Sequence, residues 1–291
     1  MKKPPKISRW LKDADYLRSH LALRKWSDER ASLLAHVRET GFFQCLETPA
    51  PRILSVGCGS GAMDIAWLEE FAQRGIAAHY LAVEPNLDSL AEFQRVAAAS
   101  LTGGVVPQLC AVGQKYEDYH PAQPLDRIMF MHSLYHFPDR EATLRKALAE
   151  LAPGGSLMVC VSDDEGLPQY KTAVYQQIEM PAQSQYFPGS DLRRIVEALG
   201  CPAQFSLATV NLEVTECLQL TPDGIALLDF FFLCRFEALT AQQQQIALTE
   251  LPLHCHTQGD RCFLKQPTLF VELTAEHRNQ PIAIMPPVQG G

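Results

Sequence analysis

Short apolar runs alternate with helix-forming segments through the first half of the chain, and this alternation restricts the possible folds more than any other feature. Between two of these runs, Leu144, Leu148 and Leu151 recur at the spacing of one face of a helix. Strands that alternate with helices form βαβ units, which build a parallel sheet. We therefore predict an α/β fold with a doubly wound, mostly parallel sheet. The predicted strands are Ile53–Val56, His79–Val83, Gln108–Val112, Ile128–Met131 and Leu157–Val161.

Helical patterns flank this region on both sides. From Asp13 to about Gly41, apolar residues recur at roughly helical spacing, which predicts one or two amphipathic helices before the first strand. Ser190 is a predicted N-cap for a helix over Leu192–Leu199, and Gly200 is its predicted end. Further predicted elements are a strongly apolar helix over Ile225–Phe236, a solvated helix face at Gln242–Gln245, a last strand over Thr268–Leu273 and a loose tail over Gln280–Gly291.

The composition argues against several classes of protein. With 291 residues, of which 47% are hydrophobic, the chain can bury a full core. Its net charge of −8 disfavours nucleic-acid binding, which draws on clustered Lys and Arg. No apolar stretch is long enough to span a bilayer, and no apolar run of signal-peptide length follows the basic start. We therefore expect a cytosolic protein without a nucleic-acid or membrane partner, either a monomer or a homodimer.

The cysteines do not have the spacing of a disulfide framework or a zinc ribbon, because their number, 9, is odd and no C-x-x-C pair occurs. A local group of His254, Cys255, His256 and Cys262 contains residue types that bind metals. Its spacing matches no standard site, and adjacent residues of a strand point in opposite directions. We therefore predict no metal site here.

A glycine-rich turn follows the first predicted strand. Gly57, Gly59 and Gly61 allow the backbone to approach a ligand closely and to present helix N-terminal amides to it. With Ala62, the turn also satisfies the G-x-G-x-x-G/A pattern of dinucleotide-binding proteins. The turn alone therefore leaves a nicotinamide enzyme and a methyltransferase equally open.

Glu84 stands where the second predicted strand ends. A carboxylate at this position can accept hydrogen bonds from both hydroxyls of a ribose, so adenosine is implied in either case. The alternative is a carboxylate that ends a strand in solvent. We expect cofactor and acceptor to meet at the carboxyl ends of the strands, where open α/β sheets bind ligands.

Two downstream segments resemble the core of class I S-adenosylmethionine-dependent methyltransferases. They are Asp126–Asp139, a strand with a polar loop at its carboxyl end, and Leu151–Val159, a Pro-Gly-Gly turn that enters a strand. The resemblance implies a Rossmann-like sheet whose last strand is antiparallel, S-adenosylmethionine as cofactor, S-adenosylhomocysteine as product and a small-molecule acceptor. It also implies an N-terminal helical substrate-cap segment (1–50), a cofactor-binding core (51–162), the rest of the core with a substrate-binding cap (163–279) and a flexible tail (280–291).

The chain further resembles the histamine N-methyltransferase family over most of its length. In that family the motif of the first strand carries a serine, as Ser55 does here. The resemblance implies methyl transfer to a nitrogen of a small amine or imidazole compound. The other segments that carry it, in the same order along the chain, are Val83–Pro85, Leu134 with Tyr135, Ser190–Leu192 and Leu227–Phe236.

The same resemblance implies roles for individual residues. Glu29 would contact the amine of the substrate, with Tyr16 in the same pocket. Either Gln114 or Tyr116 would lie near the adenine, and Met131 would lie along the flank of the cofactor. The full cofactor set is Ser55, Gly57, Gly59, Gly61, Glu84, Pro85, Gln114, Tyr116 and Met131, and the full substrate set is Tyr16, His20, Glu29, His132, Tyr135, His136 and Phe236.

Several positions depart from the family. His132 stands where the histamine enzyme has a glutamine, His136 replaces a tyrosine and His20 replaces a pocket aromatic. The acceptor site is therefore predicted to be more polar and richer in imidazole, and the acceptor need not be histamine. The late asparagine of the family falls near Lys265 or Gln266, and neither residue is assigned a role.

Glu29 and His132 are the predicted catalytic residues. Glu29 would orient a cationic group or polarise the acceptor nitrogen, and His132 would accept a proton or a hydrogen bond, since imidazole titrates near neutral pH. Glu29 could instead be a solvated helix residue, and His132 a structural histidine. Other functions stay open: an oxygen or sulfur methyltransferase of a natural-product intermediate, a silent S-adenosylmethionine-binding protein and, more remotely, a nicotinamide oxidoreductase.

Overall fold

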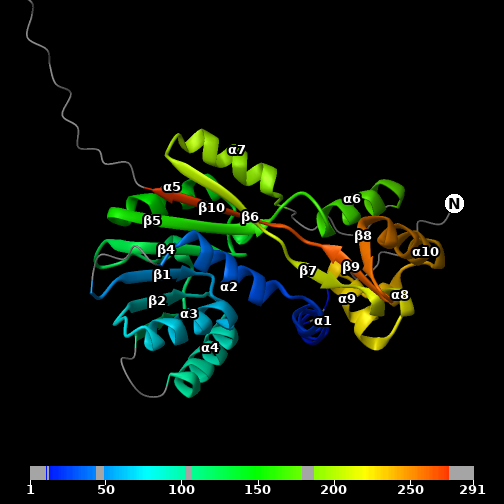
Figure 1. Ribbon diagram of the computed structural model, residues 1–291, viewed down its shortest axis with the longest axis horizontal. Helices are drawn as coiled ribbons and strands as arrows, with labels where there is room; N and C mark the ends of the chain where they lie inside the picture. The colour runs from blue at the N-terminus through cyan, green and yellow to red at the C-terminus, as the bar shows by residue number, and fades with distance from the viewer. Residues whose placement is uncertain (1–10, 12, 44–48, 102–106, 179–186, 275–291) are drawn as a thin grey trace, which may run out of the picture.

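The computed structural model describes residues 11, 13–43, 49–101, 107–178 and 187–274. Its main sheet contains β1 (Arg52–Val56), β2 (His79–Val83), β3 (Gln108–Val112), β4 (Leu125–Met131), β5 (Leu151–Ser162), β6 (Ala203–Ala208) and β10 (Thr268–Thr274). The strand order is β3-β2-β1-β4-β5-β10-β6 (Figure 1). Strands β1 to β5 are parallel, and β10 is antiparallel to both of its neighbours. This arrangement confirms the predicted Rossmann-like sheet with an antiparallel last strand.

Helices cover both faces of this sheet because successive side chains of a strand point to opposite faces. Tyr80 of β2 packs with one layer of helices, whereas Ile128 and Phe130 of β4 pack with the other. The first layer consists of α2 (Glu29–Thr40), α3 (Ala62–Gln73) and α4 (Leu87–Ser100), and the second of α5 (Arg140–Ala149) and α7 (Gly189–Leu199). Among the described residues, no helix combines the length and the apolar character needed to cross a bilayer.

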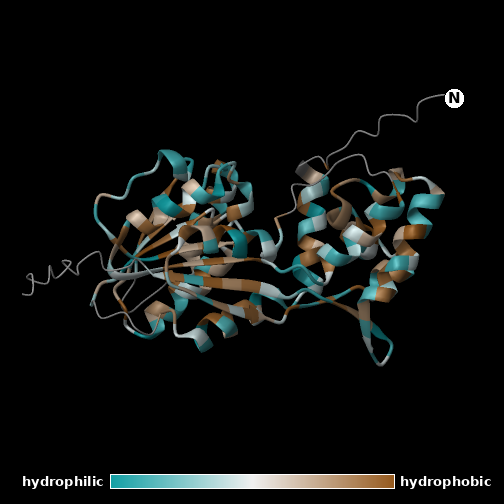
Figure 2. Ribbon diagram, turned by 90° about the horizontal axis from the view of Figure 1, so that it is seen from above, coloured by the Kyte–Doolittle hydropathy of each residue, from teal (hydrophilic) through white to brown (hydrophobic). Residues whose placement is uncertain are grey.

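A second lobe, called the cap here, lies beyond the carboxyl ends of β4 and β5 (Figures 1 and 2). Its own core is apolar, with Tyr170, Leu227 and Phe231 fully buried in it. Helix α1 packs along α9 and brings Leu23 into this core. The elements of the cap are α1 (Asp13–Trp26), α6 (Leu167–Gln177), α8 (Thr215–Gln219), α9 (Pro222–Phe232), α10 (Ala241–Glu250) and a three-stranded antiparallel sheet of β7 (Asn211–Glu213), β9 (Arg261–Lys265) and β8 (Cys255–Gln258).

A two-stranded ribbon joins the main sheet to the sheet of the cap. Strand β6 leads into β7, and β9 leads into β10, so these two segments run side by side between the main sheet and the cap (Figure 1). Between the two sheets, the amide of Gln266 donates to the carbonyl of Val210 at 2.8 Å. The carbonyl of Pro267 accepts from the amide of Asp163, also at 2.8 Å. Backbone hydrogen bonds therefore continue across the junction of the two lobes.

The apolar helix predicted to reach Phe236 ends earlier. Helix α9 ends at Phe232, because Leu233 has a left-handed backbone with φ of 51°. Phe236 then begins a short 3-10 helix, Phe236–Ala238. Neither glycine nor proline marks this end in the sequence, so the apolar pattern predicted a helix that was four residues too long at its C-terminus.

Two other local predictions are also wrong. Ser190 does not cap α7, since Pro188 is the N-cap and the Ser190 hydroxyl donates to Asp164 at 2.9 Å. Leu151 does not extend a helical stripe but begins β5. The predicted end at Gly200 is confirmed, because this residue has the left-handed conformation of a C-cap. The predicted tail, 280–291, lies outside the described residues.

Candidate functional site

The glycine-rich turn joins β1 to α3 with a left-handed backbone. Gly57, Gly59 and Gly61 have φ of 71°, 55° and 73°, values that disfavour residues with a Cβ. A Cβ added to Gly61 would lie 1.9 Å from Cδ2 of Phe93, whereas one added to Gly59 would meet nothing within 4 Å. Gly61 therefore allows the turn to pack closely on α4, and Gly59 borders open space that a ligand can fill.

Glu84 follows β2 and binds this turn directly. One carboxylate oxygen accepts from the amide of Gly59 at 2.9 Å, and the other accepts from the amide of Asn86 at 2.8 Å. Each oxygen keeps a second lone pair, so the same carboxylate can still accept hydrogen bonds from two ribose hydroxyls. The structure thus brings Gly59 and Glu84, predicted from separate motifs, into one site.

Ser55 lies beneath the turn rather than on its open side. Its side chain is buried and hydrogen-bonds Asp64, which also accepts from the hydroxyl of Tyr80 at 2.8 Å. Burial raises the pKa of Asp64. Ser55 therefore supports the glycine turn through a buried polar network instead of facing the open space above it.

Tyr116 does not lie where its predicted contact with adenine would require. Its ring packs edge-on against Phe130 and Phe137 in the core, and its hydroxyl donates to Glu150 at 2.6 Å. Of the two candidates for this contact, only Gln114 has a side chain outside the core. Its role, and those of Pro85 and Met131 near the turn, stay predictions.

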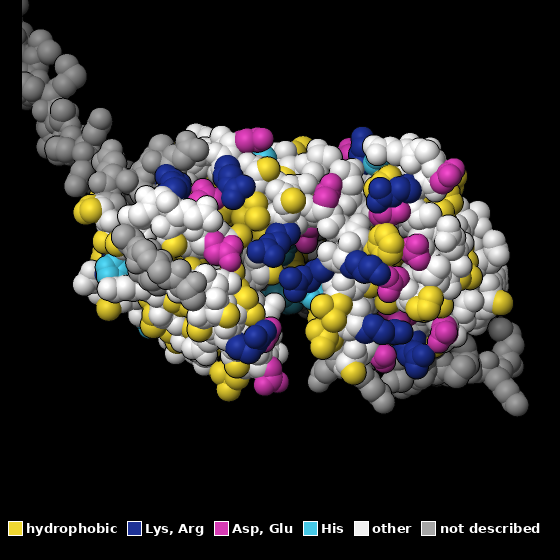
Figure 3. Space-filling model, turned by 60° about the horizontal axis from the view of Figure 1, so that its bottom comes forward, with side chains coloured by type: hydrophobic (Ala, Val, Ile, Leu, Met, Phe, Trp, Pro, Cys, Tyr) yellow, Lys and Arg dark blue, Asp and Glu magenta, His cyan; other side chains and the backbone are white. Residues whose placement is uncertain are grey.

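A cavity of about 640 Å³ opens between the core and the cap, where the molecule is hollowed between its lobes (Figure 3). This volume lies in the range of small-molecule sites. Residues from α1, α2, the end of β4, the end of β5, α6 and α9 line it. The predicted substrate residues found on its wall are Tyr16, His20, Glu29, His132, Tyr135 and His136.

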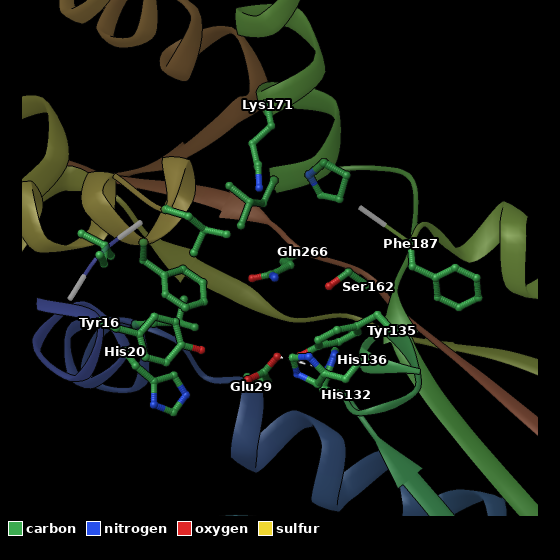
Figure 4. Close-up of a pocket in the computed structure, with 16 residues that line it drawn as sticks. Tyr16, His20, Glu29, His132, Tyr135, His136, Ser162, Lys171, Phe187 and Gln266 are labelled. Carbon is green, nitrogen blue, oxygen red and sulfur yellow. Dashed lines mark ion pairs between the residues drawn. The ribbon is translucent and has the colours of Figure 1, made fainter. Parts of the chain in front are cut away.

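Glu29 and His132 meet on the wall of this cavity (Figure 4). Glu29 is the first residue of α2, where its amide donates to Oγ of Ser27 at 3.1 Å. His132 directly follows β4, and its amide donates to the carbonyl of Cys160 at 3.0 Å. Oε1 of Glu29 lies 3.3 Å from Nε2 of His132. The fold therefore joins an acidic and a basic side chain from two distant segments.

Aromatic side chains from α1 and α9 form another part of the wall. The rings of Tyr16 and His20 are stacked with centroids 6.1 Å apart, and Phe230 lies 6.3 Å from each of them. Burial raises the pKa of Tyr16. Burial lowers the pKa of His20, and the positive charge of Arg24 lowers it further. The negative charge of Glu29 acts in the opposite direction, and the net effect leaves the pKa of His20 below that of a free imidazole.

Phe236, predicted to wall the pocket, lies instead in the core of the cap. Its ring stacks on Phe232, and its amide donates to the buried Asp229 at 2.7 Å. Because α9 ends before it, Phe230 and Leu233 take the places on the cavity wall.

Tyr135 and His136 come from a 3-10 turn, Leu134–His136, that follows His132. Burial raises the pKa of Tyr135, and the nearby Tyr16 and Glu29 add to this shift. Burial lowers the pKa of His136, whereas the charge of Glu84 acts in the opposite direction. His136 therefore lines the acceptor cavity and also interacts electrostatically with Glu84.

Ser162, Lys171 and Gln266 also line the cavity, but no motif indicated them. Ser162 ends β5, Lys171 projects from α6 and Gln266 lies in the ribbon between β9 and β10. The sequence had indicated Gln266 only as one of two residues, with Lys265, near which a substrate-binding asparagine of the family falls. No comparable signal pointed to Ser162 or Lys171, because only the folded chain brings these segments together.

The histidine and cysteine group near the end of the chain takes part in local contacts. His254 lies 3.8 Å from Glu250, and the Cys255 thiol lies 3.1 Å from the carbonyl of Leu251. Within the described part of the chain, no group of three or more His, Cys, Asp or Glu is arranged to hold a metal ion.

Comparisons with known proteins agree with this geometry. A family model described as a methyltransferase domain matches residues 17–203. Histamine N-methyltransferase from Xenopus tropicalis is 27% identical over 188 residues, which cover 61% of this chain and 64% of that enzyme. Ubiquinone biosynthesis O-methyltransferase from Xanthomonas euvesicatoria pv. vesicatoria is 33% identical over 116 residues, or 39% of this chain and 44% of that enzyme. The matches therefore span less than two thirds of either relative.

Solved structures share the fold. The YcgJ protein from Bacillus subtilis has a TM-score of 0.52 and 14% identity, over 83% of this chain and 99% of that chain. A protein from Bacillus halodurans has a TM-score of 0.50 and 14% identity, over 80% of this chain and 96% of that chain. Since the family model covers more than half of the sequence, the chain belongs to the methyltransferase domain family, the class I enzymes that use S-adenosylmethionine.

Proposed function

We propose that this enzyme transfers a methyl group to a nitrogen of a small amine or imidazole compound. The observation that carries this proposal is the pair of Glu29 and His132, 3.3 Å apart on the wall of the cavity. A carboxylate binds cationic nitrogen groups, and an adjacent imidazole can take a proton. A nitrogen acceptor needs both a group that binds it and a group that takes its proton, since the nitrogen must lose a proton around the time of methylation.

The residues near the glycine turn fit S-adenosylmethionine. Glu84 has free lone pairs for the ribose, Gly59 borders open space, Met131 ends β4, and Gln114 follows β3. When bound, the donor supplies a methyl group activated by a sulfonium. The acceptor nitrogen uses its lone pair to form the bond to the methyl carbon, while the electron pair of the S–C bond stays on sulfur.

The side chains of the cavity then perform three tasks. Glu29 orients the cationic or polar end of the acceptor, and His132 removes the proton that the nitrogen releases. Phe230 and Leu233 exclude water from the reacting groups. Holding the acceptor in line with the methyl group accounts for most of the rate acceleration in such a displacement.

A methylation screen with matched variants tests this proposal. The purified protein is incubated with S-adenosylmethionine and histamine, other amines, phenols or thiols, and S-adenosylhomocysteine is measured. We expect turnover of amines or imidazoles. Glu29→Gln should lower kcat/KM by about 10- to 100-fold, the range for a lost charged hydrogen bond, without changing the Kd of S-adenosylhomocysteine. Glu39→Gln, on the exposed part of the same helix, is the control. Equal kcat/KM values for Glu29→Gln and the unmodified enzyme would contradict the assignment.

An oxygen acceptor is the second candidate. One relative is an O-methyltransferase by name, and His132, whose Nε2 lies 3.3 Å from Glu29, could remove the proton of a hydroxyl. In that case phenols should be the best acceptors, and His132→Gln should impair turnover more than Glu29→Gln. The cytosolic location and the monomeric or dimeric state stay predictions.

A further inference from the structure

The acceptor cavity has two opposite charges on opposite walls. Lys171 projects into it from α6 in the cap, across from Glu29 and His132 on the core (Figure 4). Among the described residues that line the cavity, Lys171 is the only lysine or arginine, and Glu29 is the only aspartate or glutamate. The cavity therefore has a negative end and a positive end.

The environment of Lys171 favours an anionic ligand. Burial lowers the pKa of Lys171 to about 8, so the ammonium group is still largely protonated at neutral pH. A cation in a poorly solvated site attracts an anion more strongly than a cation in water does. A bound anion would also offset the desolvation of the lysine and stabilise its charged form.

Polar groups lie between the two charges. Gln266, which is 7% exposed, and Ser162 both line the cavity between Lys171 and the Glu29–His132 pair (Figure 4). The side-chain amide of Gln266 and the hydroxyl of Ser162 can each donate a hydrogen bond to a carboxylate. The positive end is therefore equipped with donors as well as charge.

We propose that Lys171 binds a carboxylate of the acceptor, so that the substrate is a zwitterion of the amino acid type. Its nitrogen end meets Glu29 and His132, and its carboxylate end meets Lys171. This inference rests on the proposed function of the same cavity. A single lysine balances one negative charge, whereas a phosphate dianion would leave charge without a partner in a partly buried site.

Matched pairs of compounds test the inference, because each pair differs only in the carboxylate. Histidine is compared with histamine, tyrosine with tyramine and tryptophan with tryptamine, by S-adenosylhomocysteine formation and by calorimetric binding in the presence of S-adenosylhomocysteine. We expect the carboxylate member of the preferred pair to have a kcat/KM about 10- to 100-fold higher, as for a charged hydrogen bond in a poorly solvated site.

Variants of Lys171 assign this preference to its charge. Lys171→Met should lower kcat/KM for the carboxylate compound to the level of its decarboxylated partner and leave the partner unchanged. Lys171→Arg, which keeps the charge, should keep most of the preference. Arg95→Met, which removes an exposed positive charge on α4 outside the cavity, should alter neither value.

The outcomes separate this inference from the function on which it rests. If amines are methylated but the carboxylate gives no advantage, or if Lys171→Met weakens both members of a pair equally, the role of Lys171 is wrong and the nitrogen methyltransferase stands. If no amine or imidazole compound of any pair binds or reacts, while S-adenosylhomocysteine still binds, both proposals are wrong.

Discussion

His132 has a backbone conformation that few residues other than glycine adopt, with φ of 51°. Such a conformation costs roughly 1 to 2 kcal/mol for a residue with a Cβ. It is held by the hydrogen bond from the His132 amide to Cys160 and by the neighbouring Ser133, whose hydroxyl donates to the carbonyl of Val56 at 2.5 Å. Residues with strained backbone conformations are concentrated at functional sites in proteins. Here the strained conformation directs the imidazole of His132 toward Glu29.

Glu84 gives the first prediction at this scale. Glu84→Gln keeps the shape of the side chain but removes its charge and replaces one acceptor oxygen with a donor NH₂ group, so one of the contacts to the amides of Gly59 and Asn86 is lost. We expect the Kd of S-adenosylhomocysteine to rise by about 10- to 100-fold, measured by calorimetry. Glu92→Gln, on the exposed side of α4, serves as the control. An unchanged Kd for Glu84→Gln in a folded protein would show that Glu84 does not contact the cofactor.

Residues named from local motifs were placed more reliably than residues whose roles were carried over from the family resemblance. The glycine turn and Glu84 could be predicted because local geometry dictates them: left-handed φ values and the end of a strand. Tyr116 and Phe236 could not be placed, because their directions depend on packing against Phe130 and Phe232. Lys171 was missed because a lysine on an amphipathic helix usually points to solvent. Only the folded chain places α6 on the same cavity as Glu29 and His132.

At the scale of elements, α1 and α2 are consecutive helices that belong to different lobes. Helix α2 packs with the main sheet, whereas α1 packs along α9 of the cap. Arg18 of α1 contacts the carboxylate of Asp229 of α9 at 2.6 Å, and Asp229 also accepts from the amide of Phe236. This contact fixes the helix that carries Tyr16 and His20, so it controls the wall of the cavity.

Removing this contact should loosen α1. Asp229→Ala leaves the amide of Phe236 unsatisfied and removes the closer of the two carboxylates that face Arg18, and we expect a loss of about 2 to 3 kcal/mol in the free energy of unfolding. Urea denaturation measures the loss. The KM for the acceptor should rise while the Kd of S-adenosylhomocysteine stays constant.

Asp15→Asn is the matched comparison for Asp229→Ala, because Asp15 faces the same arginine at 3.9 Å near the surface. Exposed ion pairs contribute at most about 1 kcal/mol. Equal losses in the two variants would contradict the role of the buried contact.

Six of the seven strands of the main sheet could be predicted, but β6 and the sheet of the cap could not. Strand β2 agrees with its predicted bounds because Tyr80, Ala82 and Val83 form a compact apolar run that is buried in the core. Strands β8 and β9 mix polar and apolar residues and are short, so their pattern resembles that of a loop. Gly259, with φ of 59° between them, was the available sign of a hairpin.

At the scale of the whole molecule, the two lobes share one cavity and are connected by paired backbone. The ribbon of β6–β7 and β9–β10 crosses beside the connection from β5 to α6. Each lobe nevertheless has its own apolar cluster. Such a chain should unfold as one cooperative unit, because the crossing strands belong to both sheets.

Tryptophan fluorescence can test this cooperativity. Trp26 ends α1 at the cap, and Trp67 is buried in α3 of the core. In a Trp10→Phe background, Trp26→Phe and Trp67→Phe each leave one probe. We expect both probes to report the same Tm, and S-adenosylhomocysteine at 100 times its Kd to add about 2.7 kcal/mol to each transition. A Trp26 transition at lower temperature that does not respond to the ligand would show that the cap unfolds alone.

The ribbon also limits how such an enzyme can change its substrate. The chain contributes to the cap in three separate segments: α1, α6 after Ser162, and 211–265, which leaves the core after Val210 and returns to it through Gln266. The cap is therefore not one continuous insert. Exchanging the segment between Val210 and Gln266 for that of a relative would leave the parts of the cavity wall that α1 and α6 contribute unchanged. A new acceptor preference that depends on those parts of the wall must therefore come from substitutions in α1 and α6 themselves.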